Sequence, residues 1–391
     1  MTKVYLIRHA EAEGNYYRRI QGQWDGGITP RGHKQIAALA ERMKDVQIDA
    51  LYSSDLTRTM LTAGAIQKYH NLPLHTDPRL REVYMGRWEG ISWGDAAYYE
   101  PEQYDYFSKN PDLWNVGDNE LWEPLQNRLY RAVADIAVRH DGETIAIVSH
   151  GTAIRAMMCK VWNIPGKDIN TVKHGDNTAV SLLTVENGVI SIDFANDSSH
   201  LTHDCINTSR QNWWKTGKDE GNLRFRPLDL NTEAKFYIQC YADAWRIAHG
   251  DTDGFVPALY LMSAKRWLDD HPESIAVGLD GDEIVGLAAL DTHRDAETEK
   301  GWIGFLYLLP QYRGKRYGVQ LLGYATTLYT RLGRKAVCLS VSEDNPHAYG
   351  FYTHTGFKQV GEAIGVGAPL RLMERPLGKG VLSNPKIMST S

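Results

Sequence analysis

The chain has 391 residues, of which 42% are apolar and 23% charged, and its formal net charge is −5. This length favours two or three domains with substantial cores over a single domain. The acidic balance gives no electrostatic reason to expect a nucleic-acid partner, because nucleic-acid-binding domains are usually basic. The four cysteines are far apart and form no Cys-x-x-Cys pair, which predicts reduced thiols rather than a disulfide framework or a zinc knuckle.

The amino terminus and the apolar segments bear on location. The apolar run before Arg8 is too short for the core of a signal peptide, and no apolar stretch reaches the length that spans a bilayer. We therefore expect a cytoplasmic protein with no membrane partner, whose oligomeric state is left open.

Strands and helices alternate along the first half of the chain. Residues 3–9, 49–53 and 144–149 predict buried strands, and a helix follows each of them. Thr29 and Pro30 are typical of an N-cap and a first helical residue, and Ser53-Ser54 predict the cap of a helix that runs to about residue 69. Helices are also expected from about residue 124 to 139 and from residue 152. This alternation predicts an α/β domain with a mainly parallel sheet.

Residues 93–125 interrupt the alternation with many tryptophans, tyrosines and a phenylalanine among acidic residues. Two interpretations remain open at about equal weight: a small satellite core, or a roof over a substrate.

Five side chains of this half suit the transfer of a phosphoryl group to histidine. Arg8 and His9 come directly after the first strand, where open α/β sheets place their ligands. Arg58 lies in the first turn of a helix, whose amides and dipole favour anions. His150 ends another strand and repeats the geometry of His9. A neutral histidine can attack phosphorus, arginines can hold the phosphate, and the carboxyl of Glu82 can protonate the leaving oxygen.

Together these motifs resemble the histidine phosphatase superfamily, which has the phosphoglycerate mutase-like fold, over residues 1 to about 200. The matching positions are Arg8-His9-Ala10, Asn15, Ser53-Ser54, Arg58, Thr62-Ala63, Leu80, Glu82, Gly86, Trp88-Glu89-Gly90 and Val148-Ser149-His150-Gly151. Ala10 stands where the family has glycine, and Asp118-Asn119 where a Glu-Ser pair is frequent.

The resemblance implies a role for each matching position. It makes His9 the phosphorylated residue and Glu82 the proton donor. It implies that Arg8, Arg58 and His150 hold the phosphate, with Asn15, Gln21 and Gly151 as further contacts to phosphate or substrate. No metal is expected.

A polar segment, Ser198–Asn222, separates this half from the next, and its Trp213-Trp214 pair can dock the segment onto a domain. We expect domains at residues 1–205 and 222–378, a linker at 206–221 and a polar tail at 379–391. The second domain should hold strands at 223–228, at 302–309, at 336–341 and within 274–290, where Asp280-Gly281 favours a hairpin, with two more strands ending near residue 375. Helices are predicted at 232–248, 256–270, from residue 319 and at 346–354. This pattern indicates an antiparallel-rich α+β fold.

The loop from Gln311 to Gly318 lies between a strand and a helix, an arrangement that suits a pyrophosphate and an extended pantetheine arm. Asn345, Ala348 and Tyr352 follow at fixed spacing. This half, about 222–376, resembles the GNAT family of N-acetyltransferases, although Arg316 stands where a small residue is usual. The resemblance implies that acetyl-coenzyme A is the cofactor and that Tyr352 protonates the coenzyme thiolate, whereas Glu299, Glu343 and Asp344 are candidate bases by position only. The implied cofactor-binding residues are Leu306, Leu308, Arg313, Gly314, Lys315, Arg316, Gly318 and Asn345.

The sequence thus predicts a bifunctional enzyme that dephosphorylates one small molecule and acetylates the amine of a small molecule, with both steps in one pathway. Two alternatives remain: a phosphoglycerate-type mutase in the first half, and a phosphatase regulated by a non-catalytic domain that senses acetyl-coenzyme A.

Overall fold

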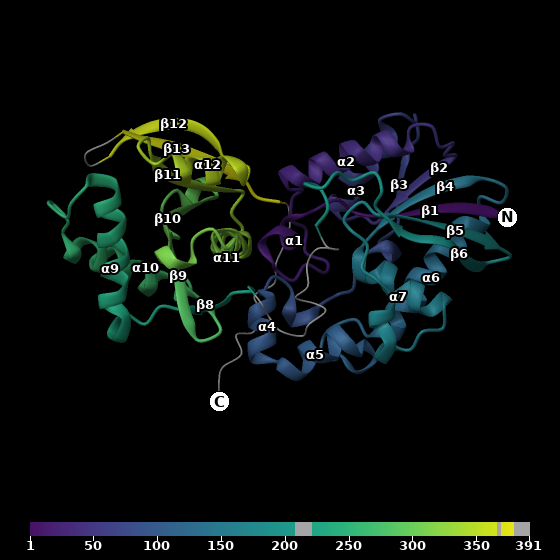
Figure 1. The fold of residues 1–391 in the computed structure, drawn as a ribbon, viewed down its shortest axis with the longest axis horizontal. Coiled ribbons are helices and arrows are strands. Elements are labelled where there is room, and N and C mark those ends of the chain that lie inside the picture. Colours follow the sequence, from purple (N-terminus) through teal and green to yellow (C-terminus); the bar gives the residue numbers. More distant parts are fainter. Residues whose placement is uncertain (208–220, 366–368, 379–391) are drawn as a thin grey trace.

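The structure, a computed structural model, describes residues 1–207, 221–365 and 369–378. Two lobes, each built around its own sheet, lie side by side (Figure 1). Most of the predicted linker, including Trp213 and Trp214, and the predicted tail lie outside the described residues. Within the described part of the chain, no helix is long and apolar enough to cross a membrane.

The first lobe contains a six-stranded sheet in the order β3-β2-β4-β1-β5-β6. Its strands are β1 (Thr2–Arg8), β2 (Ala50–Ser53), β3 (Leu74–Thr76), β4 (Thr144–Ser149), β5 (Val180–Glu186) and β6 (Val189–Asp197). The strands from β3 to β1 run parallel, as predicted, whereas β5 and β6 are antiparallel and no sequence pattern had indicated them.

Helices cover both faces of this sheet. One face packs against α2 (Pro30–Met43) and α3 (Thr57–Gln67), and the other against α6 (Trp122–Val138) and α7 (Gly151–Val161). Successive residues of β4 are buried on opposite faces, because side chains alternate along a strand. The helix α1 (Glu13–Tyr17) follows β1 and lies at the edge that faces the second lobe (Figure 1).

Two N-terminal helix caps were predicted, and one prediction was wrong. The side chain of Thr29 accepts the N–H of Gly32, as expected for the cap of α2. The N-cap of α3 is Leu56 rather than Ser53 or Ser54. Ser54 instead accepts the N–H of Leu56 at 3.3 Å, because the chain makes one more turn before the helix starts.

The aromatic segment folds into two short helices, α4 (Trp93–Tyr99) and α5 (Pro101–Lys109), which lie below α1, with α4 on the side of the second lobe (Figure 1). Trp88, Trp114 and Tyr104 are buried in the core of the lobe, and Trp88 and Trp114 pack ring against ring with centroids 5.8 Å apart. The segment therefore belongs to the main core of the lobe rather than to a separate satellite core, and the part of it that lines a cavity is described below.

The second lobe contains a seven-stranded sheet in the order β12-β13-β11-β10-β9-β8-β7. Its strands are β7 (Arg224–Pro227), β8 (Ile275–Asp280), β9 (Glu283–Asp291), β10 (Lys300–Leu308), β11 (Ala336–Ser342), β12 (Lys358–Ile364) and β13 (Pro369–Pro376). Its helices are α9 (Leu230–His249), α10 (Pro257–Asp270), α11 (Tyr317–Arg331) and α12 (Pro346–His354). All of its neighbouring strands are antiparallel except β10 and β11, as the antiparallel-rich prediction required.

The two central strands of this sheet diverge. Residues 300–303 of β10 pair with β11, but residues 305–308 pair with β9 alone, after a register shift next to Gly304. The last residues of β11 pair only with β13. The backbone edges of β10 and β11 are therefore separated at their carboxyl ends, beside the start of α11.

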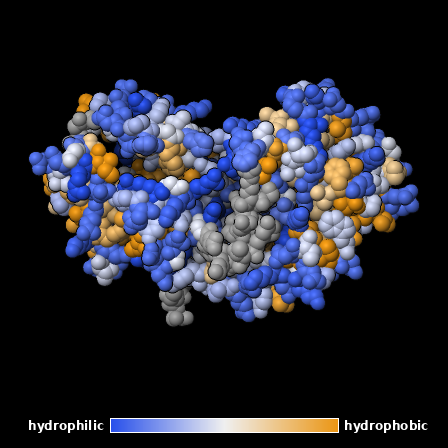
Figure 2. All heavy atoms as spheres, in the orientation of Figure 1, coloured by the Kyte–Doolittle hydropathy of each residue, from blue (hydrophilic) through white to orange (hydrophobic). Residues whose placement is uncertain are grey.

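Helix α1 of the first lobe packs on helix α11 of the second, and α4 packs on β7. An added Cβ at Gly323 of α11 would lie 2.5 Å from Cβ of Tyr17, so a glycine is required at this crossing. Arg375 of β13 donates to the Tyr17 hydroxyl and pairs with Glu13 at 2.9 Å. These contacts join the lobes through buried side chains. On the outer face shown in Figure 2, apolar residues are scattered rather than gathered in one patch.

Candidate functional sites

The first cavity has a volume of about 150 Å³ and lies at the carboxyl ends of β1 and β4. Arg8, His9 and Gly151 line it, together with Glu82 and Thr152. Because β1 and β4 are adjacent parallel strands, their ends bring His9 and His150 together, with ring centroids 5.2 Å apart. His9 is 4% exposed and His150 is fully buried.

The local geometry fixes the protonation of His9. Its Nδ1 lies 2.7 Å from the carbonyl oxygen of Ala10, so Nδ1 carries the proton and Nε2 keeps its lone pair. Burial, followed by the positive charges of Arg58 and Arg8, lowers the pKa of His9 well below its ordinary value. Ala10 has no positive φ and its N–H is bonded to the hydroxyl of Thr62 at 2.9 Å, so the alanine is accommodated where related proteins have glycine.

Arg58 and His150 are fully buried and are not among the residues that line the cavity, although the His150 ring lies beside that of His9. Both ring nitrogens of His150 and Nε of Arg58 are buried and have no hydrogen-bond partner among the described residues. The other two guanidinium nitrogens of Arg58 donate to the carbonyls of Trp24 and Gly22, which hold the side chain in place. Buried polar atoms are normally paired, and such a cluster of exceptions fits an anionic ligand.

Glu82 is held at the start of α7. Its carboxylate accepts the backbone N–H of Thr152 at 3.0 Å and of Ala153 at 2.8 Å, and also that of Val83. The side chain is 7% exposed and faces the cavity that His9 lines. The N-terminus of α7 thereby fixes a carboxyl group beside the histidine pair.

Asn15 and Gln21 also line this cavity, and each accepts a backbone N–H from the chain segment that follows β1. Asn15 accepts the N–H of Ala12 at 3.2 Å, and Gln21 accepts the N–H of Gly14 at 3.1 Å. Gly151 leaves room for Arg8, because an added Cβ would lie 2.9 Å from the Arg8 Nε. The Arg8 guanidinium donates to the carbonyl of Gly175 at 2.5 Å.

The remaining wall of the cavity comes from residues that no motif indicated. Trp93, Phe107 and Trp122 line it, so part of the aromatic segment does form a roof. Asp118 and Asn119 are not among the lining residues: Asp118 accepts the N–H of Arg87 and Asn119 that of Val116. Further lining residues missed by sequence reasoning are Arg18, Arg19, Ser108, Arg155, Ile169, His174 and Asn207.

Arg155 could have been found from its spacing, since it lies four residues after Gly151 on the same face of α7. Its guanidinium donates to the carbonyls of Val172 and Ile169 and lies 2.7 Å from His174. Burial lowers its pKa to about 10, which leaves it cationic at neutral pH.

The second candidate site lies where β10 and β11 diverge. The cofactor loop, residues 311–318, leads from β10 into α11, and Gly314 has a φ of 78° with no atom within 4 Å of an added Cβ. Arg316 is the N-cap of α11 with a φ of 64°, a left-handed conformation that glycine adopts without strain. The loop keeps the glycine-like backbone in spite of its arginine.

This arrangement fits the adenosine and pantetheine parts of a coenzyme A. The start of the long helix α11 offers backbone N–H groups for a pyrophosphate, beside Lys315 and Arg316. Residues 305–308, which include Leu306 and Leu308, present an edge of β10 that β11 does not pair with, where an amide-rich arm can bind. Arg313 donates to the carbonyl of Leu308 at 3.0 Å.

Tyr352 and Asn345 lie on and before α12. Burial raises the pKa of Tyr352, whose ring packs edge-on against Phe357. The side chain of Asn345 accepts the N–H of Ala348 at 3.0 Å, so it caps the helix that carries Tyr352.

Of the three carboxylates considered as bases, Glu299 lies away from this junction, and both Glu299 and Glu343 are paired with cations. Glu299 precedes β10, at the end where β10 and β11 are paired, and contacts Lys335. Glu343 and Asp344 follow β11, where Glu343 lies 3.6 Å from Arg371. A carboxylate that sequence reasoning missed, Asp243 of α9, instead accepts the hydroxyl of Tyr307 on β10 at 2.5 Å, so an acid side chain contacts the diverging strand from the helix side.

Comparisons with known proteins assign each lobe to a family. Residues 4–198 match the family model for the histidine phosphatase superfamily, branch 1, and residues 236–357 match that for the GNAT acetyltransferase family. Within the described residues, no group of three or more His, Cys, Asp and Glu side chains is placed to hold a metal ion.

Two curated proteins of Arabidopsis thaliana resemble the first lobe. One, the metal-independent phosphoserine phosphatase, is 34% identical over 52% of this chain and 84% of its own. The other, phosphoglycerate mutase-like protein 4, is 36% identical over 40% of this chain and 69% of its own. The solved structure of YhfR from Bacillus stearothermophilus is 31% identical, covers 51% of this chain and 99% of its own, and has a TM-score of 0.50.

The chain therefore belongs to the histidine phosphatase superfamily through its first lobe, and its second lobe is a GNAT acetyltransferase domain. It joins a phosphatase-family domain to an acetyltransferase-family domain.

Proposed function

We propose that the first domain hydrolyses a small phosphomonoester through a phosphohistidine at His9, and that the second transfers an acetyl group to the amine of a small molecule. The observation that carries the first half is the placement of His9 beside the unpartnered donors of His150 and Arg58, with Glu82 fixed at the same cavity.

The proposed hydrolysis has two steps. Nε2 of His9 attacks phosphorus, the ester P–O bond breaks, and the leaving oxygen takes the proton of Glu82 to depart as an alcohol. Water then attacks the phosphohistidine, the P–N bond breaks, and Glu82 takes a proton from that water. Arg8, Arg58 and His150 stabilise the phosphoryl oxygens in both steps.

The class of substrate follows from the relatives and from the cavity. The name of the Arabidopsis phosphoserine phosphatase supports a small phosphorylated metabolite and metal-independent chemistry. The second Arabidopsis relative is named for mutase chemistry, so a mutase is the alternative. Net release of inorganic phosphate distinguishes the two, because a mutase returns the phosphoryl group to its substrate.

For the second domain, acetyl-coenzyme A would bind along β10 with its pyrophosphate at residues 313–318. When bound, it supplies an activated acetyl thioester. Tyr352 holds a proton at neutral pH, because burial raises its pKa, and can give it to a thiolate. Asn345 keeps that tyrosine in place by capping its helix.

Covalent linkage of the two domains supports a shared metabolite, a phosphorylated amine that loses phosphate and gains acetyl in either order. A paired screen of one metabolite library, which scores release of phosphate and of coenzyme A, tests this. At least one compound should be positive in both assays.

The phosphohistidine is tested by His9→Ala on p-nitrophenyl phosphate. We expect a loss of kcat of about a thousandfold or more, because the proposed phosphoryl transfer proceeds through Nε2 of His9. Full activity of the variant would refute the mechanism. The alternative of a domain that senses acetyl-coenzyme A requires phosphatase activity that responds to the cofactor and no coenzyme A release with any amine.

A further inference from the structure

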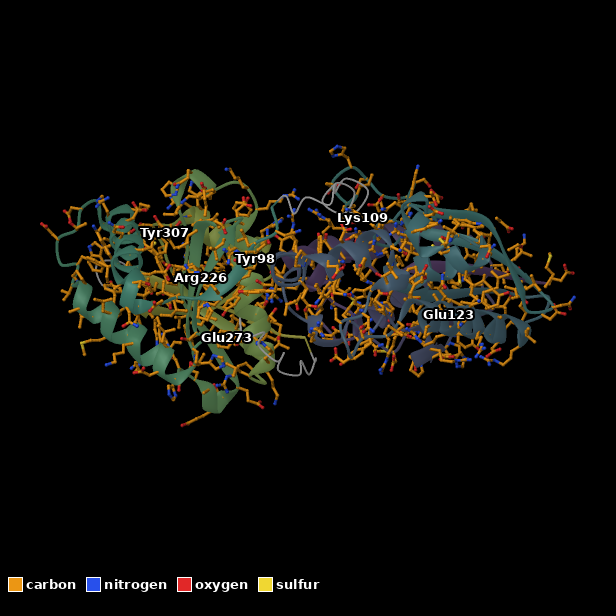
Figure 3. All side chains as sticks on the ribbon, turned by 90° about the horizontal axis from the view of Figure 1, so that it is seen from below. Tyr98, Lys109, Glu123, Arg226, Glu273 and Tyr307 are labelled. Atoms are coloured by element: carbon orange, nitrogen blue, oxygen red, sulfur yellow. The ribbon has the colours of Figure 1, made fainter. Side chains whose placement is uncertain are left out.

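Arg19 lies at the boundary between the two domains and lines two cavities. One is the phosphatase cavity, and the other is a smaller cavity of about 90 Å³ between the domains. The smaller cavity is lined from the phosphatase side by Asp95 and Glu89 and from the acetyltransferase side by Arg226, Glu273 and Tyr324, among others. Arg226 and Glu273 lie in the acetyltransferase lobe near this boundary, with Tyr98 of α4 between the lobes (Figure 3).

The acetyltransferase domain holds the Arg19 side chain. The guanidinium carbon lies 4.8 Å from the ring centroid of Phe225 and 5.5 Å from that of Tyr324, and these two rings are stacked on each other. Asp95 lies 4.0 Å from the Arg19 guanidinium and accepts the backbone N–H of Phe225 at 2.7 Å. The position of this arginine therefore depends on β7 and α11 of the other domain.

These contacts satisfy the charge of Arg19 but not its donors. Aromatic faces attract a cation without accepting N–H groups in the plane of the guanidinium. Nη1 donates to the carbonyl of Gly90 at 3.3 Å, whereas Nε and Nη2 are buried and have no hydrogen-bond partner in the described ranges. The side chain is 5% exposed, and burial lowers its pKa to about 10, so it remains a cation at neutral pH.

Nε and Nη2 form one edge of a guanidinium, and that edge matches the two oxygens of a carboxylate. The protein uses the same edge elsewhere: Arg81 binds Asp55 through Nε at 2.7 Å and Nη2 at 2.6 Å. Arg19 also lines the phosphatase cavity, so an unpaired edge of this kind is suited to a carboxylate bound there.

We propose that Arg19 binds a carboxylate of the phosphomonoester substrate and that Phe225 and Tyr324 of the acetyltransferase domain hold it in position. The acetyltransferase domain then forms part of the phosphatase's substrate site. This inference rests on the proposed phosphatase function, and it narrows the substrates to phosphomonoesters that carry a carboxylate.

The test compares two probes that differ by one carboxylate, O-phospho-L-serine and O-phosphoethanolamine. Each is measured as a competitor of p-nitrophenyl phosphate hydrolysis by the full chain, so the result does not depend on turnover of the probe. The wild type should bind phosphoserine more tightly by about tenfold or more. Arg19→Met should remove most of that preference, by raising the inhibition constant of phosphoserine toward that of phosphoethanolamine.

Three more variants separate positioning from stability. Tyr324→Leu should lower the preference for phosphoserine, whereas Tyr324→Phe, which keeps the ring and loses only the bond to the Glu273 carbonyl, should retain it. Arg331→Met is the matched control, because Arg331 lines the smaller cavity but not the phosphatase cavity. Its preference should equal that of the wild type.

A wild type that binds both probes equally, or fails to bind either, would overturn the inference. So would an Arg19→Met variant that keeps the preference, or a Tyr324→Phe variant that loses as much as Tyr324→Leu. Failure of the underlying function is visible separately, as hydrolysis of p-nitrophenyl phosphate that survives His9→Ala.

Discussion

At the residue scale, the phosphatase site depends on histidines that the fold keeps neutral. Burial, and next the positive charge of Arg58, lowers the pKa values of both His9 and His150 well below the ordinary range. A neutral imidazole can attack phosphorus without a separate base. In the proposed mechanism, the arginines that hold the phosphate would also help to keep His9 neutral and able to attack.

The same burial predicts a pH dependence of stability. The pKa of His150 is lower in the folded chain than in the unfolded chain, where it is about 6.5. Below that pH, His150 binds a proton in the unfolded state but not in the folded state. The contribution of neutral His150 to the free energy of unfolding is therefore complete above about pH 6.5 and decreases as the pH falls toward the folded pKa. His150→Asn should reduce the slope of unfolding free energy against pH by about 1.4 kcal/mol per pH unit in that window.

The measurement is denaturant unfolding of both proteins at several pH values from neutral to about pH 5. Only the difference in slope is compared, because Glu89 and Asp95, whose pKa values are raised by burial, add their own dependence to both proteins. Parallel curves would show that His150 takes up a proton in the folded state.

At the element scale, the short helix α1 serves two domains. Its residues Gly14 and Asn15 line the phosphatase cavity, and Tyr17 packs on Gly323 of α11. Helix α11 begins at the cofactor loop and also carries Gly323, so a single helix connects that loop with the contact to α1. A substitution at this crossing should therefore affect both stability and the phosphatase.

Gly323→Ala should lower the free energy of unfolding by about 1–3 kcal/mol, because the new Cβ must displace a buried tyrosine. It should also raise KM for a phosphomonoester, since Tyr17 shares α1 with Asn15. The matched control is Gly64→Ala in α3, where nothing lies within 4 Å of an added Cβ. That change should stabilise by up to about 1 kcal/mol. If the two variants had equal stability, the glycine would not be required by the crossing.

The comparison of elements with the sequence shows which features are local. Strand β4 and the helix over 346–354 have the predicted bounds, and the residues of the phosphate site follow motifs that lie within a few positions of a strand end. Strands β5 and β6 carried no comparable signal in our reading. Arg19 and Asn207 could not be assigned because their place in the cavity depends on chain segments distant in sequence. The cap of α3 was wrong because two serines before a helix do not specify which residue starts it.

At the scale of the whole molecule, the two domains meet through charged groups rather than through an apolar patch. Arg375 is buried against Tyr17 and Glu13, and Arg19 is buried against Phe225 and Tyr324. Separating the domains would expose these aromatic rings and break the Arg375–Glu13 ion pair. A buried pair that loses one partner is costly, so partial unfolding of one domain is disfavoured.

We therefore expect the chain to unfold as one cooperative unit, with a single calorimetric transition.

Coenzyme A at about 100 times its Kd should stabilise the fold by about 2.7 kcal/mol. Because the domains unfold together, it should also protect phosphatase activity against heat, although it binds the other domain. Gly314→Val should abolish this protection, since the left-handed φ of 78° excludes a β-branched residue. Arg375→Met should split the transition by weakening the interface. The contrary result would be two transitions in the wild type, with coenzyme A raising the midpoint temperature of only one and leaving the thermal inactivation of the phosphatase unchanged. It would show that the domains are independent and would remove the physical basis for a shared substrate site.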